Sequence, residues 1–307
     1  MNNFENALKH SDPVILDGGL ATQLESMGFD IDGALWSAKL LASNPRAIVD
    51  AHRAYLDAGA DCIISASYQA SREGFALIGK TPEEADALIA SSVALALNAR
   101  QEFMTENTAT DRAPIVAASV GPYGATQNDG SEYTGVYNIG VDELRAFHQQ
   151  RLMLLDQTCA DVLAVETIPN AVEAEVLAGL LNDVDTPAWI SFSCRNGKEL
   201  SDGTPLAEVT EQFAEHSRVY AVGVNCTAPE FISPLISILK NAAPKKKIVV
   251  YPNSGEFYHS HDNSWSGMAC DFDNAFDVAA WQKAGVKFIG GCCRTGPNNI
   301  AAIRARL

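Results

Sequence analysis

Apolar residues in this sequence fall into eight short runs rich in Val, Ile and Ala, and each run precedes a segment of helical character. The runs are almost continuously apolar rather than alternating, as expected for parallel strands that are buried on both faces. The intervening segments repeat their apolar residues at helical spacing, for example Ile232, Leu235, Ile236 and Leu239. The predicted strands span residues 14–19, 62–67, 114–121, 162–167, 189–194, 221–226, 248–253 and 288–293.

Proline and glycine mark the ends of the predicted helices. Pro45, Pro82 and Pro297 each stand where a helix is expected to begin, since proline is tolerated in the first helical turn. Gly59 and Gly285 are expected to end helices immediately before a strand. The chain therefore reads as a repeated strand–helix unit without an internal linker.

Eight such units predict an α/β fold, a single-domain (β/α)8 TIM barrel over residues 1–307 with its active site at the C-terminal ends of the strands. An open doubly wound sheet is the alternative. Polar residues favour the barrel, because they gather at the carboxyl ends of successive strands, and a barrel brings these ends to one mouth. They are Asp17, Gly18, Gly19, Ser65, Ser67, Ser119, Gly121, Glu166, Thr167, Ser193, Cys194, Asn225, Cys226, Asn253, Ser254, Cys292 and Cys293.

Three of the four cysteines among these strand-end residues, Cys226, Cys292 and Cys293, form the main candidate for a metal site. Adjacent side chains on a regular strand point to opposite faces, so Cys292 and Cys293 reach one ion only where the strand stops. Gly290 and Gly291 before them would give the backbone freedom for that bend. Cys226 ends another strand, and convergence at the mouth would bring it near the pair. Three thiolates leave a tetrahedral zinc with one open position.

The other cysteines do not share this pattern as a set. Cys62 begins a strand, Cys159 is predicted on a helix and Cys270 falls in a loop, whereas Cys194 also ends a strand and competes for a ligand position. The alternative is that Cys226 is a buried core thiol, which packs like a small hydrophobic residue.

The charge of the predicted centre indicates its chemistry. Three thiolates on Zn²⁺ leave a net negative charge, which makes the ion a poor activator of water. A further thiolate bound there stays nucleophilic, because little charge is withdrawn from it. The site therefore favours attack of a substrate thiol on an alkyl group, whereas a hydrolase more often uses histidine and carboxylate ligands.

Two carboxylates, Asp17 and Glu166, also end predicted strands. Each alone is compatible with helix capping or a structural ion pair. Together at the mouth they indicate a site for an α-amino acid, in which a carboxylate binds the ammonium group. Backbone N–H groups around Gly18 and Gly19 would bind the substrate carboxylate, and neither acidic residue is placed for proton transfer.

Two predicted connections, residues 121–140 and 254–273, are long and rich in aromatic and polar residues. Loops of this length are more often lids or binding loops than filler, so we expect both over the mouth. His259 and His261 in the second loop are expected to face solvent or substrate rather than a metal. Candidates for a cation-binding aromatic wall, each equally compatible with packing, are Trp36, Tyr123, Tyr133 and Trp265.

Composition narrows the classes of partner. The chain has 22 Lys and Arg against 38 Asp and Glu, with a formal net charge of -16. This charge argues against nucleic acid or an anionic membrane and is compatible with a cationic substrate. No apolar run approaches the roughly 20 residues of a membrane span, and the first residues do not resemble a signal peptide. We therefore expect a cytoplasmic protein whose cysteines are free or metal-bound.

Residues 74–81 formally match the phosphate-binding loop pattern, but their context argues against it. Six residues separate them from Ser67 at the end of the preceding strand, and Pro82 places the helix start after Thr81. A phosphate loop instead follows its strand directly and opens the helix at its Gly-Lys-Thr. There is also no G-x-G-x-x-G fingerprint for a dinucleotide.

Six sequence blocks together carry a resemblance to a known family. They are Leu16-Asp17-Gly18-Gly19, Leu35-Trp36-Ser37-Ala38, Glu166-Thr167, Gly223-Val224-Asn225-Cys226, Tyr251-Pro252-Asn253-Ser254-Gly255-Glu256 and Gly290-Gly291-Cys292-Cys293-Arg294. The chain closely resembles, nearly end to end, the bacterial and plant homocysteine S-methyltransferases that use S-methylmethionine. These belong to the zinc-dependent thiol methyltransferases, with betaine–homocysteine methyltransferase and the homocysteine domain of cobalamin-dependent methionine synthase.

The resemblance implies a catalytic Zn²⁺ bound by Cys226, Cys292 and Cys293, with the homocysteine sulfur as its fourth ligand. The homocysteine thiolate would attack the methyl group of a sulfonium, S-methylmethionine or S-adenosylmethionine, and give methionine. The implied partners are therefore small molecules.

The resemblance also implies that Asp17 and Glu166 hold the homocysteine amino group, with Gly18 and Gly19 near its carboxylate. Alternatives are a methyltransferase for selenocysteine or another thiol, and, from other classes, a zinc-dependent hydrolase or a P-loop nucleotide-binding protein. The sequence leaves the oligomeric state open and favours a monomer.

Overall fold

Eight parallel strands form a barrel in the computed structural model. The model describes the chain except residues 1, 32, 34, 109–112, 128 and 260–263, and only the backbone at 257–259, 264 and 265. The strands are β1 (Val14–Ile15), β2 (Cys62–Ile64), β3 (Ile115–Val120), β4 (Val162–Ile168), β5 (Ala188–Phe192), β6 (Val219–Asn225), β7 (Lys247–Tyr251) and β10 (Val286–Ile289). They pair in the order β1-β10-β7-β6-β5-β4-β3-β2, and a parallel bridge between Leu16 and Cys62 joins β1 to β2. The predicted (β/α)8 barrel is confirmed, and the open sheet is wrong.

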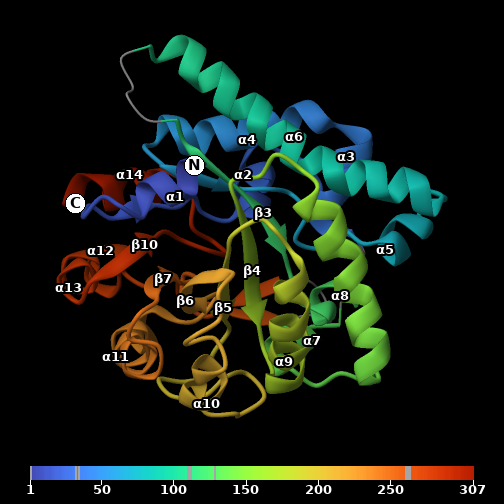
Figure 1. The fold of residues 1–307 in the computed structure, drawn as a ribbon. Helices are drawn as coiled ribbons and strands as arrows, with labels where there is room; N and C mark the ends of the chain where they lie inside the picture. The colour runs from blue at the N-terminus through green and yellow to red at the C-terminus, as the bar shows by residue number, and fades with distance from the viewer. Residues whose placement is uncertain (1, 32, 34, 109–112, 128, 260–263) are drawn as a thin grey trace.

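Helices surround the strands (Figure 1). They are α1 (Asn3–Ala7), α2 (Leu20–Ser26), α3 (Lys39–Ser43), α4 (Pro45–Asp57), α5 (Arg72–Ala76), α6 (Pro82–Glu106), α7 (Ser131–Thr134), α8 (Val141–Asp156), α9 (Ala171–Leu180), α10 (Leu206–Glu211), α11 (Ile232–Ala242), α12 (Phe272–Ala275), α13 (Val278–Lys283) and α14 (Pro297–Arg306). Helices α4, α6 and α14 begin at the three predicted prolines. Among the described helices, none is both long and apolar enough to cross a membrane.

Alternation along the strands produces two apolar layers. On β3, Ile115 and Ala117 belong to the cluster inside the barrel, whereas Val116 and Ala118 belong to the cluster under the helices. Phe4 of α1 joins the inner cluster, and its ring stacks on that of Phe288 with 5.5 Å between centroids. Both faces of the strands are therefore buried, which explains their continuous apolar runs.

Towards the carboxyl ends of the strands the inward positions become polar. Continuing the same alternation, these positions hold Ser119, Glu166, Ser191, Asn225 and Tyr251, and all five side chains are buried. Hydrogen bonds join Ser119 to Glu166 and Ser191 to Asn225 between neighbouring strands, and Tyr251 to Glu166 across the barrel from β7 to β4. This polar layer lies between the apolar barrel core and the mouth.

The two long connections contain secondary structure. The first holds the 3-10 helix η2 (Tyr123–Thr126) and α7, and the second holds an antiparallel hairpin of β8 (Phe257–His259) and β9 (Ser264–Ser266). Cys159 lies beyond the end of α8 and is exposed, so its predicted place on a helix was wrong. Gly74 lies within α5, and Thr81 caps α6, so residues 74–81 do not form a phosphate loop.

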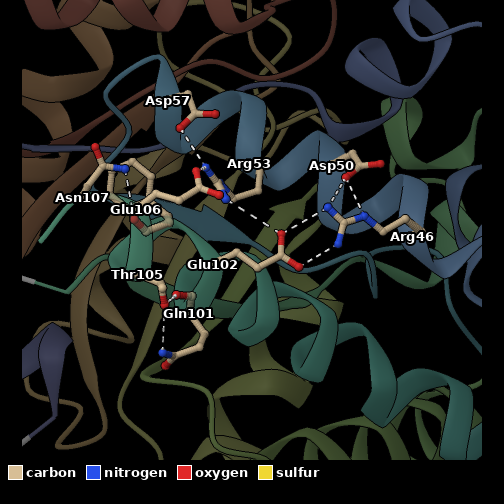
Figure 2. A network of polar contacts seen from close by, with 10 residues as sticks. Arg46, Asp50, Arg53, Asp57, Gln101, Glu102, Thr105, Glu106 and Asn107 are labelled. Atoms are coloured by element: carbon tan, nitrogen blue, oxygen red, sulfur yellow. Dashed lines mark hydrogen bonds and ion pairs between the residues drawn. The ribbon is translucent and has the colours of Figure 1, made fainter.

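Surface ion pairs join α4 to α6 (Figure 2). Arg46 of α4 is 2.7 Å from Glu102 of α6, and Arg53 of α4 is 2.5 Å from Glu106 of α6. Within α4, Arg46 is also 2.7 Å from Asp50. Exposed pairs of this kind stabilise a fold by only about 0–1 kcal/mol each. The apolar face that α4 buries therefore contributes more to holding the two helices than the ion pairs do.

Candidate functional site

A cavity opens at the carboxyl ends of the strands, where the sequence predicts the active site. Its wall includes residues from six strand ends, from the segment around α2 and η1 (Trp36–Ala38), and from α7. The lining residues used below are Gly18, Gly19, Trp36, Tyr68, Glu132, Tyr133, Glu166, Thr167, Cys226, Tyr251, Cys292, Cys293 and Arg294.

Three thiols from two strand ends meet in this cavity. The Sγ atoms of Cys226, Cys292 and Cys293 all lie within 4.8 Å of one another. The separations are 2.6 Å for Cys226–Cys292, 3.4 Å for Cys226–Cys293 and 4.0 Å for Cys292–Cys293. Among the described residues this is the one group of three or more His, Cys, Asp or Glu side chains with metal-binding spacing. Cys194 lies outside it.

Local backbone geometry sets the direction of these thiols. Cys226 adopts φ +47° directly after β6, which turns its side chain out of the strand alternation. Gly290 and Gly291 do not have positive φ, so their role differs from the predicted hinge. They allow close packing instead, because a Cβ at Gly290 would lie 2.6 Å from the Cβ of Leu16. Glycine here lets β10 approach β1 closely enough to present the cysteine pair.

The thiol cluster favours ionisation of one member. Hydrogen bonds from Cys226 and Cys292 lower the pKa of Cys293 well below its usual value, and a hydrogen bond from Tyr133 acts in the same direction. Hydrogen bonding to Cys226 and Cys293 raises the pKa of Cys292 well above its usual value. One thiolate is thus stabilised by its neighbours, and a second would need a cation nearby.

Glu166 lies in the polar layer with both carboxylate oxygens engaged. Ser119 Oγ donates to Oε1 at 2.5 Å, and the Tyr251 hydroxyl donates to Oε2 at 3.0 Å. Burial raises the pKa of Glu166 to about 7, although these two hydrogen bonds oppose the shift. The carboxylate therefore lines the cavity in a fixed orientation and would gain from a bound cation.

Asp17 follows β1, is buried, and is not among the residues that line the cavity. Its Oδ2 accepts a hydrogen bond from the Ile64 N–H at 2.8 Å, and Oδ1 has no partner among the described residues. Burial raises its pKa well above the usual value, and the charge of Glu166 adds to the shift. The two carboxylates are thus electrostatic neighbours, but only Glu166 reaches the cavity surface.

Gly18 and Gly19 both line the cavity. The Gly19 N–H donates to the Thr295 carbonyl at 2.9 Å, so it is already engaged. A Cβ at Gly18 would lie 2.2 Å from the same carbonyl oxygen. Glycine is therefore required here for close approach of the backbone.

Asn225 connects the carboxylate side of the cavity to the thiol side. Its Oδ1 accepts from the Thr167 N–H and from Ser191 Oγ, both at 2.8 Å, and its Nδ2 donates to Thr167 Oγ1 at 2.7 Å. Thr167, a β-branched residue, has φ +63°, which is costly and persists only when its surroundings hold it. Asn225 thus holds Thr167, the residue after Glu166, and is itself the residue before Cys226. This network therefore links the backbone at Glu166 to the backbone at Cys226.

Only some of the aromatic residues predicted to form a cation-binding wall line the cavity. Trp36 and Tyr133 line the cavity, whereas Tyr123 is not in its wall and packs edge-on against Tyr137 and Phe147 at 5.5 and 5.2 Å. The Trp265 and His259 side chains lie outside the described part of the structure. His261 lies outside the described residues altogether.

The first long loop contributes Glu132 and Tyr133 to the cavity, as expected of a binding loop, whereas the second contributes no lining residue among its described side chains. Sequence reasoning missed Glu132 and Tyr68. Their signal was weak, because a single Glu or Tyr in a polar loop or after a strand looks like ordinary surface composition.

The fold and the thiol cluster define a (β/α)8-barrel protein with three thiols at its mouth that lie at metal-binding spacing. Residues 14–307 match the sequence model of the homocysteine S-methyltransferase family, and the chain belongs to this family of methyltransferases. The predicted family and enzyme class are thereby confirmed.

Relatives from bacteria and plants cover nearly the whole chain. Homocysteine S-methyltransferase YbgG of Bacillus subtilis is 46% identical over 308 residues, which cover 99% of this chain and 98% of the relative. Homocysteine S-methyltransferase 4 of Zea mays is 46% identical over 300 residues, covering 94% and 87% of the two chains. The metallated form of the homocysteine methyltransferase MmuM from Escherichia coli matches with a TM-score of 0.87 at 42% identity, over the whole of both chains.

Proposed function

We propose that this protein transfers a methyl group from a sulfonium donor to the thiolate of homocysteine, and that its three clustered cysteines bind Zn²⁺ for this reaction. The observation that carries the proposal is the convergence of the Cys226, Cys292 and Cys293 sulfur atoms within 4.8 Å. The buried carboxylate of Glu166 lines the same cavity. Membership of the homocysteine S-methyltransferase family supports the acceptor.

The donor atoms fit zinc. Sulfur ligands at about 2.3 Å in a tetrahedral site lie about 3.8 Å apart, close to the Cys226–Cys293 and Cys292–Cys293 separations of 3.4 and 4.0 Å. The Cys226–Cys292 separation of 2.6 Å is shorter, so these two thiols would have to move apart to hold the ion. Thiolate ligands also select zinc over the hard cations that prefer oxygen. A metallated form exists for the Escherichia coli relative, which supports a metal here. Bound by three thiolates, Zn²⁺ would provide a position for the substrate sulfur and keep it ionised yet nucleophilic.

The protein residues would orient homocysteine. Glu166 is held by Ser119 and Tyr251 and would accept the substrate ammonium group. Asp17 is buried near Glu166 outside the cavity wall, and a bound ammonium group would favour the ionised form of both carboxyl groups. The substrate carboxylate would lie beside the backbone of Gly18 and Gly19, since both line the cavity. This arrangement would place the acceptor sulfur beside the cysteine cluster.

The transfer itself is a displacement at carbon. The acceptor thiol first loses its proton to solvent. The thiolate then forms a bond to the methyl carbon while the bond from that carbon to the donor sulfur breaks, and the electron pair stays on the donor sulfur. A thiolate and a sulfonium become two neutral thioethers, so the enzyme gains most by holding the two sulfur atoms in line.

The proposal extends to the donor, the location and the working unit. S-methylmethionine is the proposed donor in preference to S-adenosylmethionine, on the sequence blocks around Trp36 and Tyr251. A cytoplasmic location is supported by seven free cysteines, and a monomer is proposed as the working unit.

The test is metal content together with methionine formation from homocysteine and S-methylmethionine. The wild-type protein should hold about one zinc per chain and form two methionines per transfer, and Cys293→Ser should lose both zinc and activity. The matched control is Cys194→Ser, which changes a strand-end cysteine outside the cluster and should keep both. Retention of stoichiometric zinc and methyl transfer by Cys293→Ser would refute the proposal. Competition with S-adenosylmethionine and with selenocysteine would identify the donor and acceptor.

A further inference from the structure

Glu132 places a second carboxylate in the cavity, on a different element from Glu166. It belongs to α7, is 4% exposed and lines the cavity wall. Its Oε2 atom is buried and has no hydrogen-bond partner among the described residues. An ionised carboxylate buried without a partner is destabilising, so such a group is retained where a ligand provides the missing partner.

Among the described residues, no basic side chain pairs with this carboxylate. Arg294 is the basic residue of the cavity wall, and its Nε is 3.1 Å from the carboxylate of Glu256. Among the ion pairs of the described residues, none includes Glu132. A cationic ligand in the cavity would therefore be a suitable partner for the Oε2 atom of Glu132.

The position of Glu132 relates it to the thiol cluster. Tyr133, the next residue, hydrogen-bonds to Cys293. Electrostatic repulsion from Cys293 also contributes to a raised pKa of Glu132, so the two groups are close. Tyr68 and Tyr133 line the same cavity. The negative charge of Glu132 contributes to the raised pKa of both tyrosine hydroxyl groups, so both residues lie near its carboxylate. Aromatic faces beside a carboxylate are typical of sites that bind weakly hydrated organic cations.

We propose that Glu132 recognises the positively charged sulfonium group of the methyl donor. This inference rests on the proposed function, which brings a sulfonium into the cavity beside the cysteine cluster. Glu166 would bind the ammonium group of homocysteine, so the two carboxylates divide acceptor and donor between them. Tyr68 and Tyr133 would surround the sulfonium methyl groups.

The charge change during the reaction gives Glu132 a particular kinetic signature. The donor sulfur loses its positive charge as the methyl group leaves, so the attraction is strongest in the ground state and weaker in the transition state. A group of this kind lowers the KM for the donor without raising kcat. It also favours release of the product, because the product thioether is no longer cationic at sulfur.

The experiment compares binding of S-methylmethionine with that of methionine, which differs by the sulfonium methyl group and its charge. Calorimetry on the zinc-loaded enzyme would measure both affinities for wild type and Glu132→Gln. The wild type should prefer S-methylmethionine, and the variant should lose this preference by roughly tenfold or more, the scale of one charge pair in a partly buried site. In turnover, the variant should raise the KM for S-methylmethionine while the KM for homocysteine and kcat change less than about twofold.

The matched control is Asp129→Asn, which removes a nearby exposed charge from the same loop outside the cavity. It should leave the preference for the sulfonium intact. An equal loss in Asp129→Asn and Glu132→Gln, or an unchanged preference in Glu132→Gln, would overturn the inference.

Two measurements distinguish failure of this inference from failure of the proposed function and from misfolding of the variant: the zinc content and activity of the wild type, and the melting temperature of the variant. A wild-type protein without zinc or methyl transfer refutes the proposed function, whereas an active wild type with an unaffected Glu132→Gln variant refutes only the role of Glu132. Thermal melting reports folding, and Glu132→Gln should melt no lower than wild type because it removes a buried unpaired charge. If it fails to fold, Glu132→Asp serves instead, since it keeps the charge and should retain the preference for the sulfonium; loss of that preference would refute the inference.

Discussion

Replacing Asn225 by alanine should destabilise the protein by several kcal/mol. The side chain is completely buried and makes three hydrogen bonds, two to Thr167 and one to Ser191. A hydrogen bond contributes about 0.5–1.5 kcal/mol net, and leaving a buried donor such as the Thr167 N–H unpaired costs about 1–3 kcal/mol. The free energy of unfolding should therefore fall by about 3–4 kcal/mol, a large share of the roughly 5–15 kcal/mol typical of native proteins.

The same change should also disturb the site. Thr167 at φ +63° would lose the hydrogen bonds from Asn225 that hold it. Glu166 directly precedes Thr167, and Cys226 directly follows Asn225, so the positions of both site residues should change. We expect a higher KM for homocysteine and weaker zinc retention against a chelator than in wild type.

Urea denaturation followed by circular dichroism measures the stability change. Asn241→Ala provides the control, because Asn241 is an exposed residue of α11 and its replacement should change stability by less than about 0.5 kcal/mol. A loss below about 1 kcal/mol in Asn225→Ala, or a normal KM for homocysteine in a destabilised variant, would refute the view that this network holds the two sides of the site together.

Two further predictions concern the scaffold. Burial lowers the pKa of His52 to about 4 from an unfolded value near 6.5, so the unfolded chain binds the proton more tightly and stability is lost as pH falls through this window, by up to about 3 kcal/mol. His52→Leu should remove that loss, and a stability difference between variant and wild type that stays constant in urea titrations from pH 7 to pH 4 would contradict it. Gly223→Ala should lower the melting temperature strongly, because its Cβ would lie 1.8 Å from the Val249 carbonyl oxygen inside the barrel. Gly296→Ala, where a Cβ meets nothing within 4 Å, is the control, and equal melting temperatures would show that the barrel accommodates the methyl group.

The barrel was predictable because its signals are local. Each strand is a continuous apolar run that requires burial on both faces, and prolines at positions 45, 82 and 297 mark helix starts in the sequence as in the structure. The hairpin of β8 and β9 was not predicted, since short strands in a polar loop lack an apolar run.

Site residues on strand ends could be anticipated, because strand order alone carries Cys226 to the mouth with Cys292 and Cys293. Their precise presentation could not, since it depends on φ +47° at Cys226 and on the close packing of Gly290 against Leu16. Both are consequences of contacts between distant segments.

By itself the sequence determined the α/β repeat, the family resemblance and the identity of the clustered thiols, because these depend on residue type and spacing. Only the tertiary structure decided which polar side chains reach the cavity: Asp17 is buried outside its wall, Tyr123 packs away from it, and Glu132 lines it with one oxygen that has no partner among the described residues. The physical reason is that the direction of a side chain in a loop or just after a strand depends on the residues that pack around it. That packing comes from segments far apart in the chain.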